Sequence, residues 1–190
     1  APLKGHEFRR ACHNIGGEFI QISPASKNCI NIMEIRKNDK TASLQLDGEA
    51  IERSELSAKI QRLHIFFSLL IPDMTHEERQ LLDEAMIKTY AEKGITHQNE
   101  SLYEPTGAYK PMPILGDLHK VLMENAETKR MANILNRLVN GSASTFNQQT
   151  NVKLDNKYIV LDISELTGDL LTVGMFLALD YVWDKAKEDR

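Results

Sequence analysis

The sequence predicts a helix-rich α/β fold in which an all-α block, residues 51–150, lies between two α/β pieces, residues 1–50 and 151–190. Three observations predict this class. Apolar and polar residues alternate near the start of the chain, whereas the middle carries apolar residues at three- and four-residue steps. A continuous run of β-branched residues follows near the end. With 190 residues, 42% hydrophobic and 26% charged, the chain has the composition of a globular domain.

The first piece is expected to contain a short helix, a glycine turn and a strand. We expect residues 6–14 to be helical and Gly16 and Gly17 to end the helix, because glycine readily adopts the left-handed conformation found there. Residues 18–22 alternate between polar and apolar side chains, which is typical of a strand. A second short apolar run, residues 30–35, is counted as another strand.

Four helices are predicted in the middle of the chain: from residue 54 to the break at Pro72, from Thr75 to Gly94, and over residues 115–124 and 128–140. The second helix begins with a capping-box pattern, in which the side chains of Thr75 and Glu78 each bond a backbone N–H that the first turn leaves free. Residues 95–113 contain three prolines and no periodicity, which predicts a long surface loop.

The final piece is predicted to be a strand followed by a long helix. Residues 158–163 form an apolar, β-branched run that suits a strand buried on both faces of a parallel sheet. Residues 170–187 form the helix. A stripe of apolar side chains marks the side expected to pack on the sheet: Leu171, Met175, Leu179 and Val182. Three short strands cannot by themselves form a doubly covered parallel sheet, so we expect strands to be missing from it.

The residues encode no self-contained active site. The sequence contains neither Gly-x-x-x-x-Gly-Lys-Ser/Thr nor Gly-x-Gly-x-x-Gly, the glycine-rich loops that cradle phosphates. No metal-ligand spacing is present. Acidic runs on helices, such as Asp184 with Glu188 and Asp189, are interpreted as solvated faces rather than paired catalytic carboxylates.

Overall charge disfavours nucleic acid as the main ligand. The formal net charge is −4, and the two small basic clusters, within residues 4–10 and 36–40, are offset by acids. The longest nearly unbroken apolar run, residues 65–71, is far shorter than the ~20 residues that span a bilayer. Cys12 and Cys29 are too few for a disulfide framework, which favours free thiols and a cytoplasmic location.

Two stretches of the chain resemble a known family. The first comprises residues 2–8 and 15–24, with the Gly-Gly turn followed by a strand that ends at Ser-Pro, and the second comprises residues 145–183. In their order and spacing they resemble the VirB-type (TraC/TraE-like) ATPases that energise conjugative type IV secretion, in the segment between the Walker A and Walker B motifs. The resemblance implies a partial RecA-like P-loop NTPase core with an all-α insertion.

The resemblance also implies a function. A parent ATPase would bind ATP and Mg²⁺ through residues outside this segment, so the segment itself is expected to be inactive and to hold no cofactor. Pro2, Glu7 and Phe8 match the start of the family pattern, with Ala1 where an aspartate is expected, and Glu7 is the candidate catalytic residue. The implied partners are other subunits of the same ATPase and components of the secretion channel, at the cytoplasmic, inner face of the cell membrane.

A second interpretation stays open. The apolar stripes within residues 65–71 and 131–139 are also compatible with a self-standing helical module that binds a partner helix. A nucleic-acid binder is a third class, but it would need a more extensive basic surface than the two clusters provide.

Overall fold

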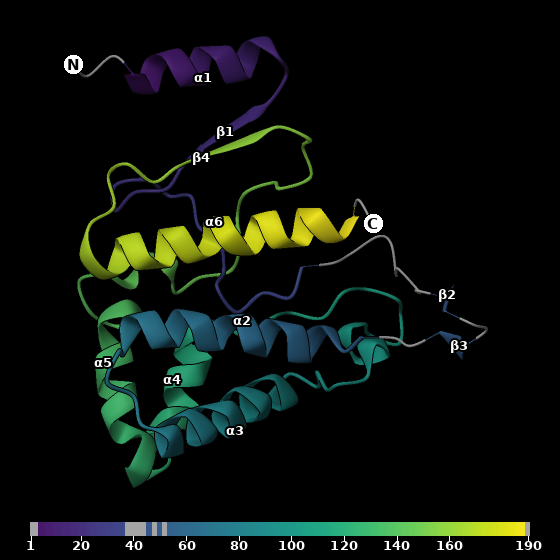
Figure 1. Ribbon diagram of the computed structural model, residues 1–190, viewed down its shortest axis with the longest axis vertical. Helices are drawn as coiled ribbons and strands as arrows, with labels where there is room; N and C mark the ends of the chain where they lie inside the picture. Colours follow the sequence, from purple (N-terminus) through teal and green to yellow (C-terminus); the bar gives the residue numbers. More distant parts are fainter. Residues whose placement is uncertain (1–3, 37–44, 47–48, 51–52, 189–190) are drawn as a thin grey trace.

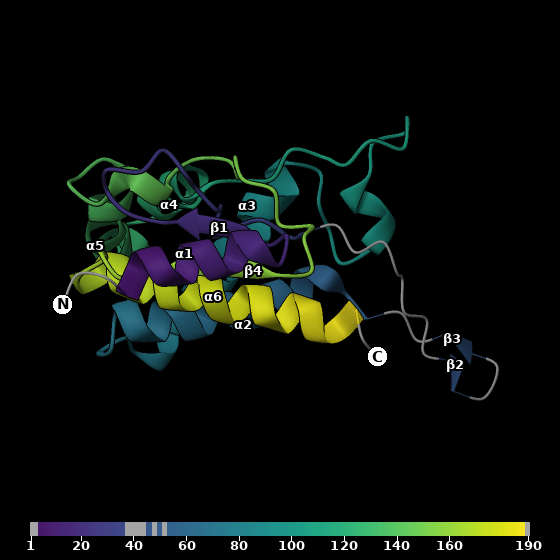
Figure 2. The same ribbon diagram turned by 90° about the horizontal axis from the view of Figure 1, so that it is seen from above.

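The computed structural model describes residues 4–36, 45–46, 49–50 and 53–188 of the chain. Figure 1 shows a pair of strands, β1 (Glu18–Gln21) and β4 (Ile159–Asp162), between helix α1 (Lys4–Asn14) and helix α6 (Gly168–Glu188). A helical block lies beyond α6 and consists of α2 (Glu55–Leu70), α3 (His76–Glu92), α4 (Leu115–Met123) and α5 (Lys129–Val139). Strands β2 (Gln45–Leu46) and β3 (Glu49–Ala50) form a separate antiparallel hairpin, which Figure 2 shows to one side of the molecule.

The helix, glycine turn and strand predicted at the start of the chain are confirmed. Gly16 has a φ of 73°, in the left-handed region, and Gly17 packs so closely that an added Cβ would lie 2.8 Å from the Cys12 Sγ. Strand β1 then pairs in parallel with β4, with residues 18–21 opposite residues 159–162 in register. The first and last thirds of the chain therefore meet in one small sheet.

Strand β4 is less buried than the sequence predicts. Its four residues are all partly exposed, whereas the apolar run predicts a strand covered on both faces. Within the described ranges β4 pairs only with β1, so each of the two strands has one edge without a strand neighbour. A fully buried parallel strand needs neighbours and covering helices on both sides. For the part of the chain that the structure describes, the sheet has two strands, and the absence of further strands of a larger sheet stays a prediction.

Residues 30–35 are not a strand, and this prediction is wrong. They belong to an irregular but buried segment, residues 29–36, which we call the strap. Side chains rather than a neighbouring strand satisfy its backbone: the Tyr90 hydroxyl donates to the Met33 carbonyl, and the Tyr109 hydroxyl donates to the Ile35 carbonyl. The apolar run is therefore a core segment whose backbone partners come from distant parts of the sequence.

The helices of the block begin and end close to the predicted positions. Ser54 caps α2 by accepting a hydrogen bond from the Ser57 N–H. The capping box of α3 is present, with Thr75 N–H donating to the Glu78 Oε1 at 3.2 Å and Glu78 N–H donating to the Thr75 Oγ1 at 3.1 Å. These local signals suffice to predict where α2 and α3 begin, because each cap involves residues only three apart.

The connection between α3 and α4 is more than the surface loop that the sequence predicts. Residues 99–102 form a short 3-10 helix, and Tyr103 forms a β-bridge with Tyr109. Ile95, Leu102 and Met112 are buried in the core. These apolar contacts fix the connection to the helical block.

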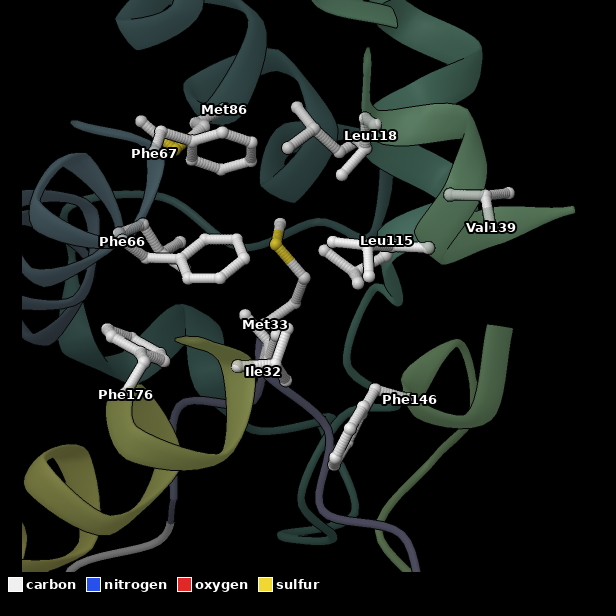
Figure 3. Packing of buried hydrophobic residues seen from close by; sticks show 14 of the residues in the cluster. Ile32, Met33, Phe66, Phe67, Met86, Leu115, Leu118, Val139, Phe146 and Phe176 are labelled. Carbon is white, nitrogen blue, oxygen red and sulfur yellow. The ribbon is translucent and has the colours of Figure 1, made fainter. Parts of the chain in front are cut away.

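The core lies between α6, the strap and the helical block. In Figure 3, Met33 of the strap extends between Phe66 of α2 and Leu115 of α4, and Phe176 of α6 faces Phe66. The rings of Phe66 and Phe176 have centroids 5.3 Å apart. The strap therefore occupies the centre of the packing between the helical block and α6.

Helix α6 forms, but the opposite side from the predicted one is buried. The predicted stripe is exposed: Leu171 is 36% exposed, Met175 53%, Leu179 64% and Val182 62%, with Trp183 beside it at 60%. The buried side carries Val173, Phe176, Leu177 and Asp180. Periodicity marks an apolar side of a helix but does not say which of two apolar sides has a neighbour. We call the exposed set Leu171, Met175, Leu179, Val182 and Trp183 the outer face of α6.

Candidate functional site

A cluster of five charged side chains lies where α2, α6 and the end of the strap meet. It consists of Arg36 from the strap, Lys59 and Arg62 from α2, and Asp180 and Asp184 from α6. We call it the charge cluster. Its members come from three segments that are far apart in the sequence, so it joins the helical block to both segments that follow the strands.

Asp180 is the centre of the charge cluster. Its Oδ2 accepts hydrogen bonds from the Lys59 Nζ at 2.7 Å and from the Arg36 Nη2 at 2.6 Å. Its Oδ1 lies 3.0 Å from the Arg62 Nε, within ion-pair distance but not aligned as a hydrogen bond. The side chains of Lys59 and Asp180 have no exposed area. One fully buried carboxylate therefore contacts three cations.

Asp184, one turn further along α6, binds the same two arginines. The Arg36 Nε donates to its Oδ2 at 2.6 Å, and the Arg62 Nη1 donates to its Oδ1 at 3.1 Å. The Asp184 side chain is 21% exposed. Two sequence-based interpretations are corrected here. Asp184 is not part of a solvated acidic face, and Arg36 is not part of a basic surface cluster; Lys37, Lys40 and Asp189 lie outside the described residues.

The pKa values of Asp180 and Lys59 follow from their burial and from the excess of cations over carboxylates in the cluster. Burial alone would raise the pKa of Asp180, but Lys59, Arg36 and Arg62 together hold it below its ordinary value. Burial lowers the pKa of Lys59 to about 8, with Asp180 opposing the shift and the two arginines adding to it. Asp180 is therefore firmly ionised, whereas burial disfavours the charged form of Lys59.

The carboxyl ends of β1 and β4 form a second polar site. Because the strands are parallel, Gln21 and Asp162 end at the same edge of the sheet, and ligands of open α/β sheets bind at such edges. The Asp162 Oδ1 accepts from the Ser164 N–H at 3.0 Å, and the Asn28 Nδ2 donates to the Gln21 carbonyl at 3.0 Å. These groups stabilise the turns that leave the strands.

Glu7 is exposed in the first turn of α1, where a carboxylate interacts favourably with the helix dipole. In Figure 1 this end of α1 lies on the same side of the molecule as the carboxyl ends of both strands. Within the described ranges, no group of three or more His, Cys, Asp or Glu side chains could hold a metal ion. None of the described helices is long and apolar enough to cross a bilayer.

Sequence reasoning missed the charge cluster, although a local signal was present. Lys59 interrupts the apolar stripe of α2, between Leu56 and Leu63. Asp180 and Asp184 are spaced to lie on one side of α6. A cation and two carboxylates on helix sides that also carry core residues indicate buried pairing, but sequence alone does not bring α2 and α6 together.

The geometry places the chain in the class of helix-rich α/β proteins in which a helical block is inserted between two parallel strands. The solved structure of VirB4 of Thermoanaerobacter pseudethanolicus is similar to it, with a TM-score of 0.74 and 26% sequence identity over 96% of this chain and 66% of that chain. No protein-family model and no curated protein matches the chain. The resemblance to a VirB-type protein is thereby confirmed, and this chain spans 66% of the length of that VirB4 chain.

Proposed function

We propose that this chain is a segment of a VirB4-type ATPase of a type IV secretion system. The segment transmits movement of the nucleotide-binding core to the helical block. In this proposal the strand pair belongs to a RecA-like nucleotide-binding core, the helical block is inserted between the strands, and α6 returns to the core. The observation that carries the proposal is the open parallel strand pair, in a chain similar to VirB4 along 96% of its length.

The exposure of the outer face of α6 supports the proposal that this chain is part of a larger core. Three of the apolar side chains of this face, Leu179, Val182 and Trp183, are each at least 60% exposed. Burying one such aliphatic side chain stabilises a fold by about 1.5–3 kcal/mol, and parallel strands need neighbours at both edges. We infer that further strands of the same core cover this face and pair with the open edges of β1 and β4.

ATP and Mg²⁺ would be bound by residues that this sequence does not contain. Phosphoryl transfer in this class of enzyme depends on a glycine-rich phosphate loop, its lysine and a metal-binding Ser or Thr, and no such loop occurs among the 190 residues. The isolated chain is therefore expected to hydrolyse no ATP. Its contribution is mechanical, because the helical block follows movements of the strand pair.

Glu7 is proposed to position the attacking water near the γ-phosphate in the complete enzyme. Its location supports this role, because the start of α1 and the carboxyl ends of both strands lie on the same side of the molecule. The carboxyl edge is where nucleotides bind in open α/β sheets. A purely structural role of Glu7 in the first turn of α1 is the alternative. The Glu7→Gln graft distinguishes this role from water positioning.

The proposed partners, process and location follow from the same resemblance. Other subunits of the same ATPase and components of the secretion channel are the proposed partners. Conjugative DNA transfer is the proposed process, and the cytoplasmic side of the cell membrane is the proposed location.

A self-standing helical interaction module is the second candidate, and one of its two proposed surfaces is not free. Met131, Leu135 and Leu138 of α5 are buried in the core of this chain. Among the large apolar residues of α2, only Ile65 and Leu69 are exposed, at 60% and 58%. The partner helix would therefore have to bind α2 without the α5 stripe.

A graft tests the ATPase proposal. The matched part of VirB4 from Thermoanaerobacter pseudethanolicus is replaced by this chain, and phosphate release is measured with MgATP. The expected result is ATP hydrolysis by the folded graft. A folded graft that releases no phosphate above background contradicts the proposal.

The same graft tests Glu7. The Glu7→Gln graft is expected to lose at least about 100-fold in rate if the carboxylate positions water. The control is Glu77→Gln, a change in the first turn of α3, where Glu77 is exposed. A Glu7→Gln graft with the unchanged rate would assign Glu7 only to the stability of α1.

A further inference from the structure

We propose that the charge cluster is a latch that fixes the register of α6 against α2 and so holds the strand pair and the helical block in one relative position. The proposal goes beyond the ATPase assignment and does not depend on it. It rests on the direction of the two helices, on what surrounds each charge, and on which segments meet at the cluster.

Helices α2 and α6 run in opposite directions where they pack. Lys59 near the start of α2 contacts Asp180, whereas Phe66, further along α2, packs against Phe176, which precedes Asp180 on α6. Apart from the charge cluster, the buried side of this interface is apolar, with Leu63 and Val173 also fully buried. Apolar burial is non-directional, so these contacts specify the register of the two helices less strictly than paired charges do.

A slide of one helical turn, about 5.4 Å, would leave a buried charge unpaired in either direction. One direction moves Asp180 into the place of Phe176, beside Phe66 and among apolar side chains. The other moves Phe176 into the place of Asp180, and Lys59 then faces a ring, whose centroid is already 5.7 Å from its Nζ, in place of a carboxylate. An uncompensated buried charge is strongly destabilising, so the cluster admits one register.

The latch also holds the strap. The strap follows β1 after the connection formed by residues 22–28, and Arg36 at its end binds both Asp180 and Asp184. Helix α6 follows the carboxyl end of β4. The segments that follow both strands are therefore fastened to α2 at the same point, and a movement of the carboxyl edge of the sheet reaches the helical block there.

The latch is tested by a distance measurement between spin labels on α2 and α6. Labels are attached at Ile65→Cys and Leu179→Cys, both exposed positions, after Cys12 and Cys29 are replaced by alanine. The parent protein is expected to give one distance. In the apolar double variant Lys59→Met/Asp180→Leu, Arg36 and Arg62 each keep a bond to Asp184.

The double variant is expected to fold with an unfolding equilibrium constant within about tenfold of the parent value, because a well-packed apolar pair can replace a buried ion pair. It is also expected to show a second distance, displaced by up to about 5 Å, which is one helical turn. A single unchanged distance overturns the proposal. A double variant that fails to fold also overturns it, because the cluster would then supply stability rather than register.

A matched control uses the exposed ion pair between Lys88 of α3 and Glu124 at the end of α4. Its N and O atoms lie 2.6 Å apart, and the side chains are 55% and 50% exposed. The variant Lys88→Met/Glu124→Leu is expected to keep the single α2–α6 distance. A second distance in this control would overturn the assignment of the latch to the buried cluster.

Discussion

Asp180 and Lys59 form an ion pair in which neither side chain is exposed, and the carboxylate oxygen that contacts the Lys59 Nζ also accepts a hydrogen bond from Arg36. Asp180 thus has three cationic neighbours, whereas Lys59 has one carboxylate and two like charges near it. This asymmetry means that the two partners of one ion pair contribute differently to stability.

Removing the carboxylate is expected to be far more damaging than removing the ammonium group. Asp180→Ala leaves three cations with Asp184 alone, and we expect a loss of about 3–5 kcal/mol in the free energy of unfolding. Lys59→Met leaves Asp180 paired with two arginines and removes a poorly solvated charge, so a loss of less than about 1 kcal/mol is expected. Urea denaturation measures both. Equal losses would contradict the asymmetry.

The lowered pKa of Lys59 predicts a particular dependence of stability on pH. Its folded-state pKa is about 8, against an ordinary value of 10.5. Between these values the unfolded chain holds the proton that the folded chain has released, so the unfolded state binds more protons and the free energy of unfolding rises with pH.

The measurement compares the parent protein with Lys59→Met. Relative to the variant, the parent is expected to gain about 1–2 kcal/mol between about pH 7.5 and about pH 9.5. Burial raises the pKa values of Tyr90 and Tyr109, which lowers stability at higher pH, but both proteins share these residues. A parent-minus-variant difference that stays flat or falls over this range would show that Lys59 is not destabilised in the fold.

The strap depends on a buried amide. The Asn31 Nδ2 donates to the Pro113 carbonyl at 2.9 Å, and its Oδ1 accepts from the Met33 N–H at 3.0 Å. Asn31→Ala removes these bonds and the one that Nδ2 donates to the Gln149 Oε1 at a fully buried position, so we expect a loss of about 2–3 kcal/mol, measured by thermal or urea unfolding. Asn140→Ala, which removes an exposed amide bond to Asn136, is expected to cost less than about 0.5 kcal/mol. Similar losses in both variants would exclude a special role for Asn31.

The two sides of α6 are expected to respond differently to truncation. Phe176 is 5% exposed and packs on Phe66, so Phe176→Ala should lower the free energy of unfolding by about 3–5 kcal/mol. Leu179 is 64% exposed, and Leu179→Ala should change it by less than about 0.5 kcal/mol. A large loss from Leu179→Ala would mean that the outer face is already covered in the isolated chain, for example by self-association.

The sequence predicts the parts of this fold that depend on neighbouring residues. The Thr75 and Glu78 capping box, the Gly16 turn and the limits of the helices all follow from interactions over a few positions. The strap could not be recognised in this way. Its run of apolar residues fits a strand as well as a core segment, and the difference depends on Tyr90 and Tyr109, which are more than fifty positions away.

The same limit applies to the candidate site. Helix α6 has two apolar sides, and only the position of α2 determines that Phe176 is buried while Leu179 is exposed. The pairing of Lys59 with Asp180 joins residues 121 positions apart. Glu7 was named from a resemblance to a family, and its role stays a prediction.

We propose above that the outer face of α6 is an internal surface of a larger VirB4-type core. Trp183 is the single tryptophan of the chain and lies on this face, so its fluorescence reports on the claim directly. Quenching by acrylamide is measured in the isolated chain and in the VirB4 graft after any tryptophan of the host part has been replaced. Ready quenching is expected in the isolated chain, and protection of Trp183 is expected in the graft. Equal quenching in the two proteins would contradict the proposal.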